Sequence, residues 1–214
     1  MGSRMGEGLP KQFLLLRDSP ILLYTLNVFL NSFPDLEIVL ALPGDYIERG
    51  AEIARLSDFP GRIKLAQGGG TRFHSVKNAL ALVPADAIVF VHDGVRCLVT
   101  PGLIHRCYEA ALEKGNAVPA VYPVDSIRIE ESGGNRTIGR ERIRIIQTPQ
   151  TFGAAILKKG FQQEYQDLFT DEATVVEQLG VQINLVEGEH TNIKITRPAD
   201  LALAAEILRE RVVR

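Results

Sequence analysis

The sequence predicts an α/β protein with a doubly wound, mainly parallel sheet and a projecting β-hairpin arm. Its 214 residues, 45% of them hydrophobic, are enough for one domain with a sizeable core. Short apolar runs alternate along the chain with segments of helical periodicity, which is typical of βαβ units. One polar stretch, 125–146, instead alternates apolar and polar residues around Gly133 and Gly134, which indicates a hairpin.

The alternation is regular through the first 124 residues. Each expected strand is a nearly continuous apolar run, which suits a strand covered by helices on both faces. The first helix begins at Ser19-Pro20, a typical N-cap and first-turn pair. The expected strands are 36–43, 62–67, 87–93 and 117–124, and the expected helices are 19–33, 45–57, 73–83 and 100–115.

The pattern resumes after the hairpin, with helices expected at 154–166, 171–180 and 197–212 and strands at 181–188 and 192–196. The segment 125–146 is too polar and too rich in arginine for a buried sheet, so we expect it to project as an arm. Isolated hairpins are marginally stable unless they pack on something. A solvated hairpin and a dimerisation arm therefore both remain open from the residues alone.

Composition excludes several classes of protein. The net charge of −2, with both signs well mixed, does not support nucleic-acid binding by bulk counterion release. No apolar run approaches 18 residues and the start lacks a signal-peptide core, so we expect a cytoplasmic protein without membrane contact. Cys97 and Cys107 lack the spacing of a metal or redox site, and we expect ordinary reduced thiols.

Candidate site residues follow the expected strands, because ligands of open α/β sheets bind beyond the carboxyl ends of the strands. The loop "GGGTRFHS" lets backbone approach a ligand closely, and its Ser75 opens a helix whose N-terminal amides favour anions. The loop "HDGVR" places Asp93 and Arg96 after the next strand. A carboxylate there commonly binds a metal or hydroxyls, and the arginine fork suits phosphate.

Two cations, Arg4 and Lys11, lie on a glycine-punctuated loop at the start of the chain. Such a pair suits a triphosphate, because negative charge builds up during phosphoryl or nucleotidyl transfer. Lys194 precedes the last helix and, by itself, would be a solvated surface group. Other chemistries lack their motifs: there is no G-x-x-x-x-G-K-[ST], no G-x-G-x-x-G after a first strand and no G-x-S-x-G.

Seven ordered motifs together resemble the 2-C-methyl-D-erythritol 4-phosphate cytidylyltransferase family. They are "GSRMG…PKQFLLL", "GGGTRFHSVKNAL", "VFVHDGVRCLV", "PVDSIR", "QTPQTF", "TDEATVVEQLG" and "EGEHTNIKITRPADLALAAEIL", and they cover nearly the whole chain. The resemblance implies a nucleotidyltransferase-type fold. It also implies transfer of CMP from CTP to the sugar-alcohol phosphate, with release of pyrophosphate and use of Mg²⁺.

The resemblance also implies roles for individual residues. Arg4 and Lys11 match the pair that stabilises the transition state, and Gly2 matches the phosphate-loop glycine beside them. The positions that match the cytosine and ribose site are Gly69, Gly70, Ser75 and Gly94. The positions that match the methylerythritol-phosphate pocket are Asp93, Arg96, Ser126, Thr148, Thr170 and Lys194.

Arg140 matches an arginine that reaches the substrate phosphate from the hairpin arm of the partner subunit, so the resemblance implies a homodimer with shared sites. Some positions depart from the family pattern. Gly94 and Cys97 replace alanine and proline, Ser126 replaces threonine, and Gly139 replaces an acidic residue. None of these departures removes a charge that the chemistry needs.

The start of the chain departs further. Family members carry a first strand and an Ala-Ala-Gly turn ahead of this loop, whereas Met1 stands between the two expected glycines. We therefore expect the first strand to be missing upstream of Met1, leaving unpaired backbone groups in the sheet and weaker nucleotide binding or stability. Two alternative functions stay open: a ribitol 5-phosphate cytidylyltransferase, and a catalytically silent nucleotide-binding or assembly protein.

Overall fold

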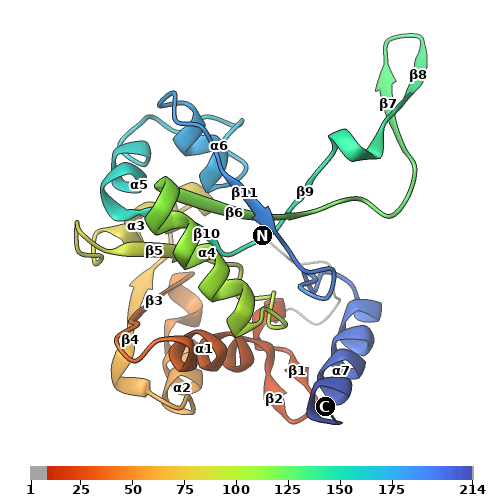
Figure 1. The fold of residues 1–214 in the computed structure, drawn as a ribbon. Helices are drawn as coiled ribbons and strands as arrows, with labels where there is room; N and C mark the ends of the chain where they lie inside the picture. Colours follow the sequence, from red (N-terminus) through yellow and green to blue (C-terminus); the bar gives the residue numbers. More distant parts are fainter. Residues whose placement is uncertain (1–8, 214) are drawn as a thin grey trace.

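Two sheets form the centre of the computed structural model, which describes residues 9–213 (Figure 1). The larger has the order β11 (Leu185–Glu187), β6 (Asn116–Val121), β10 (Gln150–Gly153), β5 (Ile88–Val91). The smaller joins β3 (Ile38–Leu42) to β4 (Ile63–Gln67) in parallel. Parallel pairing also joins β11 to β6, so the expected α/β class with parallel elements is confirmed.

The larger sheet is mixed, because β10 runs antiparallel to both β5 and β6. Its sequence "QTFG" is too short and too polar to register as an apolar run, and the sequence did not predict it. Tertiary pairing stabilises it instead, with Gln150 opposite Val91 and Gly153 opposite Ile88. β9 (Ile145–Ile146) likewise pairs antiparallel with the end of β6, so the last residues of the expected arm return to the sheet.

Helices cover both faces of the sheets. They are α1 (Ile21–Ser32), α2 (Ile47–Arg55), α3 (Arg72–Leu80), α4 (Pro101–Lys114), α5 (Ala154–Gly160), α6 (Glu172–Glu177) and α7 (Pro198–Val213). All seven fall within the expected ranges or one residue outside them, although α5 ends six residues early. In α4, the Thr100 hydroxyl accepts the Leu103 N–H at 3.1 Å and Gly115 ends the helix with φ 84°.

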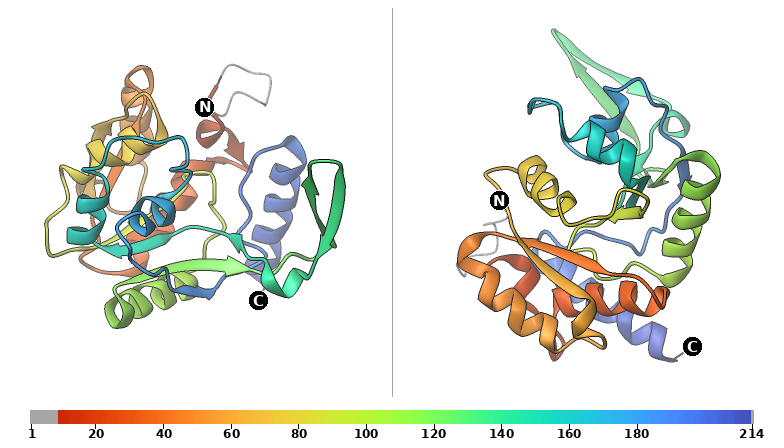
Figure 2. Two further views of the ribbon diagram at one scale, coloured as in Figure 1. Left: turned by 90° about the horizontal axis from the view of Figure 1, so that it is seen from above. Right: turned by 90° about the vertical axis from the view of Figure 1, so that its left-hand side faces the viewer.

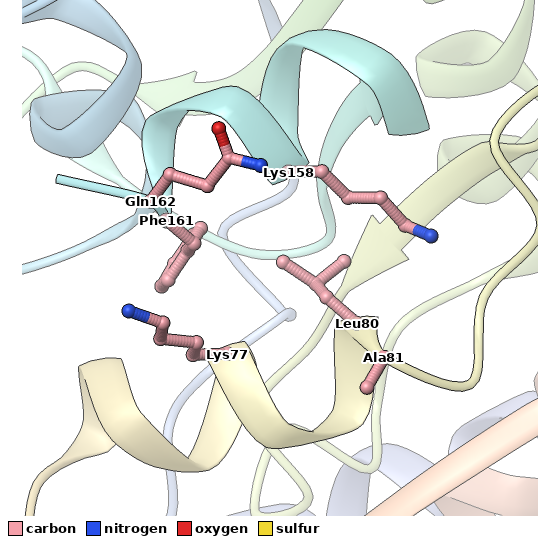
Figure 3. A pocket seen from close by; sticks show the side chains of 6 residues that line it. All are labelled: Lys77, Leu80, Ala81, Lys158, Phe161 and Gln162. Carbon is pink, nitrogen blue, oxygen red and sulfur yellow. The ribbon is translucent and has the colours of Figure 1, made fainter.

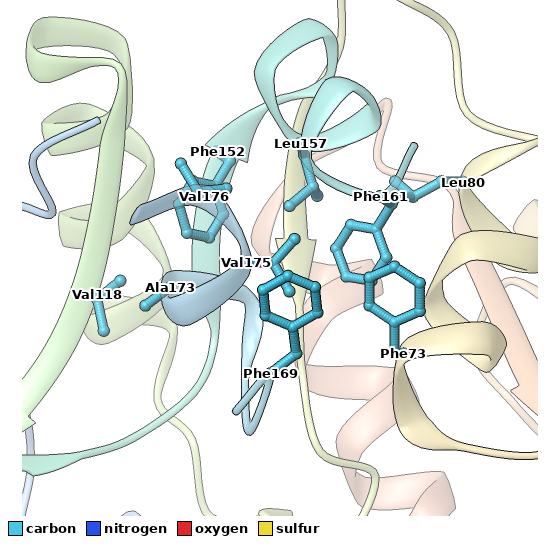
Figure 4. Packing of buried hydrophobic residues seen from close by; sticks show 10 residues of the cluster. All are labelled: Phe73, Leu80, Val118, Phe152, Leu157, Phe161, Phe169, Ala173, Val175 and Val176. Atoms are coloured by element: carbon cyan, nitrogen blue, oxygen red, sulfur yellow. The ribbon is translucent and has the colours of Figure 1, made fainter. Parts of the chain in front are cut away.

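The core explains why the strands are apolar on both faces. Along β5, Ile88 and Phe90 pack with α1 and α4, whereas Val89 and Val91 pack with α3, α5 and α6. This follows from the period of two along a strand. Figure 2 shows the two helical layers, and Figure 4 shows the aromatic side of the core, where the rings of Phe73 and Phe161 stack at 4.7 Å.

The hairpin arm stands clear of the sheets (Figure 1). It consists of β7 (Ile127–Glu131) and β8 (Gly134–Ile138), joined by a turn in which Gly133 has φ 95°. A left-handed turn residue is what a tight hairpin requires, and glycine adopts it without strain. The expected hairpin is thus present in a shorter form, followed by a 3-10 turn at Arg140–Arg142.

The expected strand at 192–196 is wrong. This segment does not pair with a strand. Its Ile195 N–H instead donates to the carbonyl of Val95, in the loop after β5, at 3.0 Å. Across residues 9–213, β3 and β5 each have a single strand partner, so their other edges are unpaired. The first strand expected upstream of Met1 stays a prediction. Within the same residues, no helix is long and apolar enough to cross a membrane.

Candidate active site

Three cations surround the carboxylate of Asp93 just beyond the end of β5. The Nζ of Lys194 lies 2.9 Å from Oδ2, the Nε of Arg96 lies 3.5 Å from Oδ2, and an Nη of Arg72 lies 3.8 Å from Oδ1. These residues come from the loop after β5, the start of α3 and the segment before α7. The fold therefore gathers charges that are up to 122 residues apart in the sequence.

This Asp93 cluster carries more positive than negative charge. Burial by itself would raise the pKa of Asp93, but Lys194, Arg72 and Arg96 hold it below its ordinary value, so the carboxylate stays ionised. The side chains of Lys194 and Arg72 are 46% and 40% exposed, whereas that of Asp93 is 15% exposed. Two cations thus keep free surface toward solvent, and the arrangement suits a phosphate-bearing ligand.

A buried ion pair fixes Arg72. Its guanidinium binds both carboxylate oxygens of the fully buried Glu172, with an Nη2–Oε2 distance of 2.8 Å. Burial opposes the charge on Arg72, but Glu172 and Asp93 outweigh it and raise the pKa of the guanidinium. Burial raises the pKa of Glu172, against the opposing effect of Arg72. The pair ties α3 to α6 and holds one cation at the edge of the cluster.

The glycine-rich loop before α3 is folded on itself. The Ser75 hydroxyl accepts the Gly69 N–H at 3.0 Å and donates to the Thr71 carbonyl at 3.0 Å. A Cβ at Gly69 would lie 2.4 Å from the Cβ of His74, so this position requires glycine, whereas a Cβ at Gly70 would meet nothing within 4 Å. The Thr71 hydroxyl caps α3 by accepting the His74 N–H at 3.3 Å.

Other predicted residues adjoin the Asp93 cluster. Lys11 is almost buried, and its Nζ donates to the Thr196 carbonyl at 2.7 Å, two residues beyond Lys194. Gly94 follows Asp93, and its carbonyl accepts the Thr25 hydroxyl at 3.4 Å. Thr148 is nearly buried and binds the Asp93 N–H. Thr170 is exposed, two residues before Glu172.

The remaining predicted residues lie elsewhere. Ser126 begins the arm, and Arg140 follows it, where its guanidinium donates to the Val124 carbonyl at 3.0 Å. Both belong to the part of the chain that projects from the sheets in Figure 1. Gly2 and Arg4 lie outside the described residues. Within one chain, the described contacts therefore join Arg96, Thr148 and Lys194 to Asp93, whereas those of Gly69 and Ser75 stay within their own loop and Arg140 contacts Val124.

Sequence reasoning missed three residues of this region. Arg72 and Glu172 both stand inside the quoted motifs "GGGTRFHS" and "TDEAT", so the motifs could have marked each as a site residue, although not as partners of each other. Asn192 is fully buried; its carbonyl accepts from Arg96 at 2.9 Å and its amide donates to the Thr148 carbonyl at 2.9 Å. Asn192 also stands inside a quoted motif, but nothing in that motif indicates partners 44 and 96 residues away.

Two further features bear on ligands. Among residues 9–213, no group of three or more His, Cys, Asp or Glu side chains could hold a metal ion by itself. A hollow of about 180 Å³ between α3 and α5 (Figure 3) is lined by Lys77, Leu80, Ala81, Lys158, Phe161 and Gln162. The Nζ of Lys158 contacts the Val83 carbonyl there. The hollow does not include the Asp93 cluster.

Comparison with known proteins decides the family. The model of the 2-C-methyl-D-erythritol 4-phosphate cytidylyltransferase family matches residues 1–210. This chain belongs to that family. A cytidylyltransferase of that name from Bacteroides thetaiotaomicron is 43% identical over 207 residues, which are 97% of this chain and 94% of the relative. The Bacteroides fragilis relative of the same name is 42% identical with the same coverage.

Solved structures of the family have the same fold. The 2-C-methyl-D-erythritol 4-phosphate cytidylyltransferase from Thermus thermophilus is 33% identical, with a TM-score of 0.75 over 96% of each chain. The 4-diphosphocytidyl-2C-methyl-D-erythritol synthase from Anaerococcus prevotii is 25% identical, with a TM-score of 0.84 over 96% of this chain and 92% of that one. The expected nucleotidyltransferase-type fold is thereby confirmed.

Proposed function

We propose that this protein transfers CMP from CTP to 2-C-methyl-D-erythritol 4-phosphate, giving 4-diphosphocytidyl-2-C-methyl-D-erythritol and pyrophosphate. Membership of the cytidylyltransferase family over residues 1–210 carries this proposal. The Asp93 cluster supports it, because three cations around one carboxylate suit a ligand with both hydroxyl and phosphate groups. The family also favours a catalyst over a silent nucleotide-binding protein.

The reaction transfers the CMP group by substitution at one phosphorus atom. A phosphate oxygen of the sugar-alcohol phosphate forms a bond to the α-phosphorus of CTP. The bond from that phosphorus to the bridging oxygen breaks, and its electron pair leaves with pyrophosphate. The protein has to hold the two anions in line and to stabilise the charge that accumulates between them.

The described residues divide these tasks. We assign Lys11, with Arg4, to the charge on the triphosphate, because Lys11 lies beside the segment that carries Lys194. Asp93 accepts hydrogen bonds from substrate hydroxyls, while Lys194 and Arg96 bind its phosphate. The loop of Gly69 and Ser75 receives the cytidine, because at its tip Gly70 is exposed and a Cβ on it would meet nothing within 4 Å.

We propose that the divalent cation used in the reaction is Mg²⁺. The described residues fit an ion that arrives with CTP, because Mg²⁺ keeps several waters and binds substrate phosphates and does not need a cage made only of protein ligands. Among residues 9–213, Asp93 is the partly exposed carboxylate of the cluster, and Glu172 is fully buried. When bound, the ion would neutralise charge on the phosphates; its ligands would be phosphate oxygens of CTP and water, because the Asp93 carboxylate is already bound by Lys194, Arg96 and Arg72.

We further propose a homodimer formed through the arm. Arg140 follows β8, and its described hydrogen bond is to the Val124 carbonyl and not to the Asp93 cluster of its own chain. A groove of about 360 Å³ is lined by residues of β6 and β11 together with Tyr122, Arg144, Gly188 and His190. Two of its lining side chains, Tyr122 and Leu185, are exposed apolar groups, and Val124 and Ile145 are exposed close by in the sequence. A second copy would cover this surface and receive Arg140.

We place the reaction in the cytoplasm. Both cysteines are free and buried. Burial raises the pKa of Cys97 to about 11 and of Cys107 to about 12, so neither is a reactive thiolate. Free, unreactive thiols fit a reducing compartment.

Pyrophosphate release tests the function. The purified protein is incubated with CTP, Mg²⁺ and either 2-C-methyl-D-erythritol 4-phosphate or ribitol 5-phosphate. We expect release with the first alcohol phosphate and little with the second. Release with ribitol 5-phosphate alone would favour the alternative substrate. Silence with both, in this chain and in one extended upstream of Met1, would favour a nucleotide-binding protein without activity.

A further inference from the structure

Behind the carboxylate of Asp93, a histidine and a threonine form a short chain of hydrogen bonds. The Thr148 hydroxyl lies 2.9 Å from Nδ1 of His92 and accepts the Asp93 backbone N–H at 3.2 Å. The other ring nitrogen, Nε2 of His92, lies 3.1 Å from the Arg96 carbonyl. These groups link the loop after β5 to the residues that lead into β10.

The direction of each hydrogen bond follows from the partners. A backbone carbonyl can only accept, so Nε2 of His92 carries a proton and donates it to Arg96. In a neutral imidazole, Nδ1 is then an acceptor, and the Thr148 hydroxyl donates to it. The oxygen of Thr148 in turn accepts the Asp93 N–H. The hydroxyl proton is therefore committed to the protein interior.

The surroundings keep the imidazole neutral. The ring of His92 packs against the ring of Phe29, with centroids 4.9 Å apart. Burial lowers the pKa of His92 to about 4, although Asp93 acts in the opposite direction. The neutral tautomer with the proton on Nε2 therefore holds across the pH range in which most cytoplasmic enzymes work.

Sheet pairing sets the positions of these residues. β10 pairs with β5 so that Gln150 lies opposite Val91, and the same antiparallel register continued by two residues brings Thr148 opposite Asp93. On its other side, the Thr148 carbonyl accepts the side-chain amide of Asn192 at 2.9 Å. Thr148 thus connects the strand end that carries Asp93 with the segment that carries Lys194.

We infer that His92 is a positioning residue. Its neutral ring orients the Thr148 hydroxyl, and this hydroxyl fixes the Asp93 backbone. The Asp93 carboxylate is thereby directed at the hydroxyl groups of the sugar-alcohol phosphate. This deepens the proposed function and rests on it. Thr148 acts on the substrate through Asp93, because its proton is used by His92 and its oxygen by the Asp93 N–H. Neither residue touches the nucleotide in this role.

Steady-state kinetics of four variants test the inference. Thr148→Val removes the hydroxyl, and Thr148→Ser keeps it. His92→Gln keeps a donor near Nε2 but loses the acceptor for Thr148, whereas His92→Asn keeps an acceptor near Nδ1. The control is Thr151→Val, which removes a buried hydroxyl from β10 that lies against Cys107 instead of His92.

We expect T148V and H92Q each to raise KM for 2-C-methyl-D-erythritol 4-phosphate about tenfold, the effect of one lost hydrogen bond, with KM for CTP unchanged. T148S should recover most of the loss, H92N should be milder than H92Q, and T151V should not change the KM. The double variant T148V/H92Q should be no worse than either single variant, because both break the same link. Equal increases in both KM values, or additive losses, would overturn the inference.

A second measurement does not depend on turnover. Nitrogen-15 NMR of labelled histidine in the full chain reports which ring nitrogen carries the proton. We expect His92 at pH 7 to carry it on Nε2 only, and T148V to shift the Nδ1 signal. A proton on Nδ1 would overturn the inference even in an active enzyme. Conversely, an inactive wild type with the expected signals would refute the proposed reaction and leave the hydrogen-bond assignment standing.

Discussion

The Asp93 cluster and the hairpin arm both gather charged residues, but they hold them in opposite ways. In the cluster, Asp93 is bound by Lys194, Arg96 and Arg72, which come from three separate parts of the chain. On the arm, Arg128 donates only across its own hairpin, to Asn135 and Thr137. The cluster is thus set by the whole fold, whereas the arm keeps its geometry independently and can present residues to another molecule.

The largest effect on turnover should come from a cation outside the arm, Lys11. Lys11→Ala should lower kcat about 100-fold with a smaller change in KM, because a charge-stabilising lysine acts mainly in the transition state. Lys64→Ala is the matched control, since Lys64 only pairs with Glu37 on the surface, with both side chains about half exposed. Steady-state kinetics with CTP as the varied substrate measures both. A rise in KM alone would mean that Lys11 only binds the ground state.

Loss of Arg140 should lower activity as much as loss of Lys11, but Arg140 should serve the active site of the partner chain. Arg140→Ala and Lys11→Ala chains, each nearly inactive, are mixed after partial unfolding and refolded together. Random pairing makes half of the dimers mixed, each with one complete site, so about a quarter of wild-type activity should return. Pyrophosphate release measures it. No recovery, with mixed dimers shown by mass spectrometry, would place Arg140 in its own chain's site or in none.

The next largest effect should be on stability, where the Arg72–Glu172 pair should contribute more than the exposed Arg136–Glu131 pair. Arg72→Ala leaves the carboxyl of Glu172 unpaired where none of its surface is exposed, and it should cost about 3 kcal/mol of unfolding free energy. Urea denaturation followed by circular dichroism measures this. A loss below 1 kcal/mol would show that Glu172 is already protonated and that the pair adds little.

Acid should lower the free energy of unfolding because His92 takes up a proton more readily in the unfolded chain. Its pKa is about 4 in the folded protein against an ordinary 6.5, so between these values the unfolded chain takes up a proton that the folded chain does not. Stability should therefore fall by up to about 3 kcal/mol as pH drops from 6.5 to 4, and this contribution should level off below 4. Urea denaturation of wild type and H92N across this range isolates it. Parallel curves would contradict a neutral, half-buried ring at His92.

The smallest effect should come from the arm's own ion pair. Arg136 binds Glu131 at 2.5 Å, but the two side chains are 57% and 53% exposed. Arg136→Ala should change the unfolding free energy by less than about 1 kcal/mol, because exposed pairs are screened by water and salt. A loss as large as that of Arg72→Ala would remove the distinction between the two regions.

Local signals account for what the sequence predicted well. Thr100-Pro101 and Gly115 mark both ends of α4, and the alternating segment around Gly133 predicts the arm. Asp93 and Ser75 could be found because they follow strands. The strand β10, by contrast, has no pattern of its own and exists because two neighbours pair with it.

The partners of the site residues could not be predicted for a related reason. Arg72 and Glu172 are 100 residues apart, and nothing local to either one specifies the other. Lys194 was expected in a strand, but the N–H groups of the next two residues instead bind the Val95 carbonyl and the Asp200 side chain. Contacts of this kind follow from the assembled topology, which periodicity in one stretch does not encode.

The antiparallel pairing of β10 with β5 has a consequence for how this chain can change over evolutionary time. Since Thr148 reaches Asp93 only through the register that sets Gln150 against Val91, substitutions in β10 that keep its length preserve the site. An insertion or deletion of one residue between Thr148 and Gln150 would move Thr148 by about 3.3 Å relative to Asp93. Length variation in this enzyme should therefore be tolerated at the tip of the arm and excluded from 148–150.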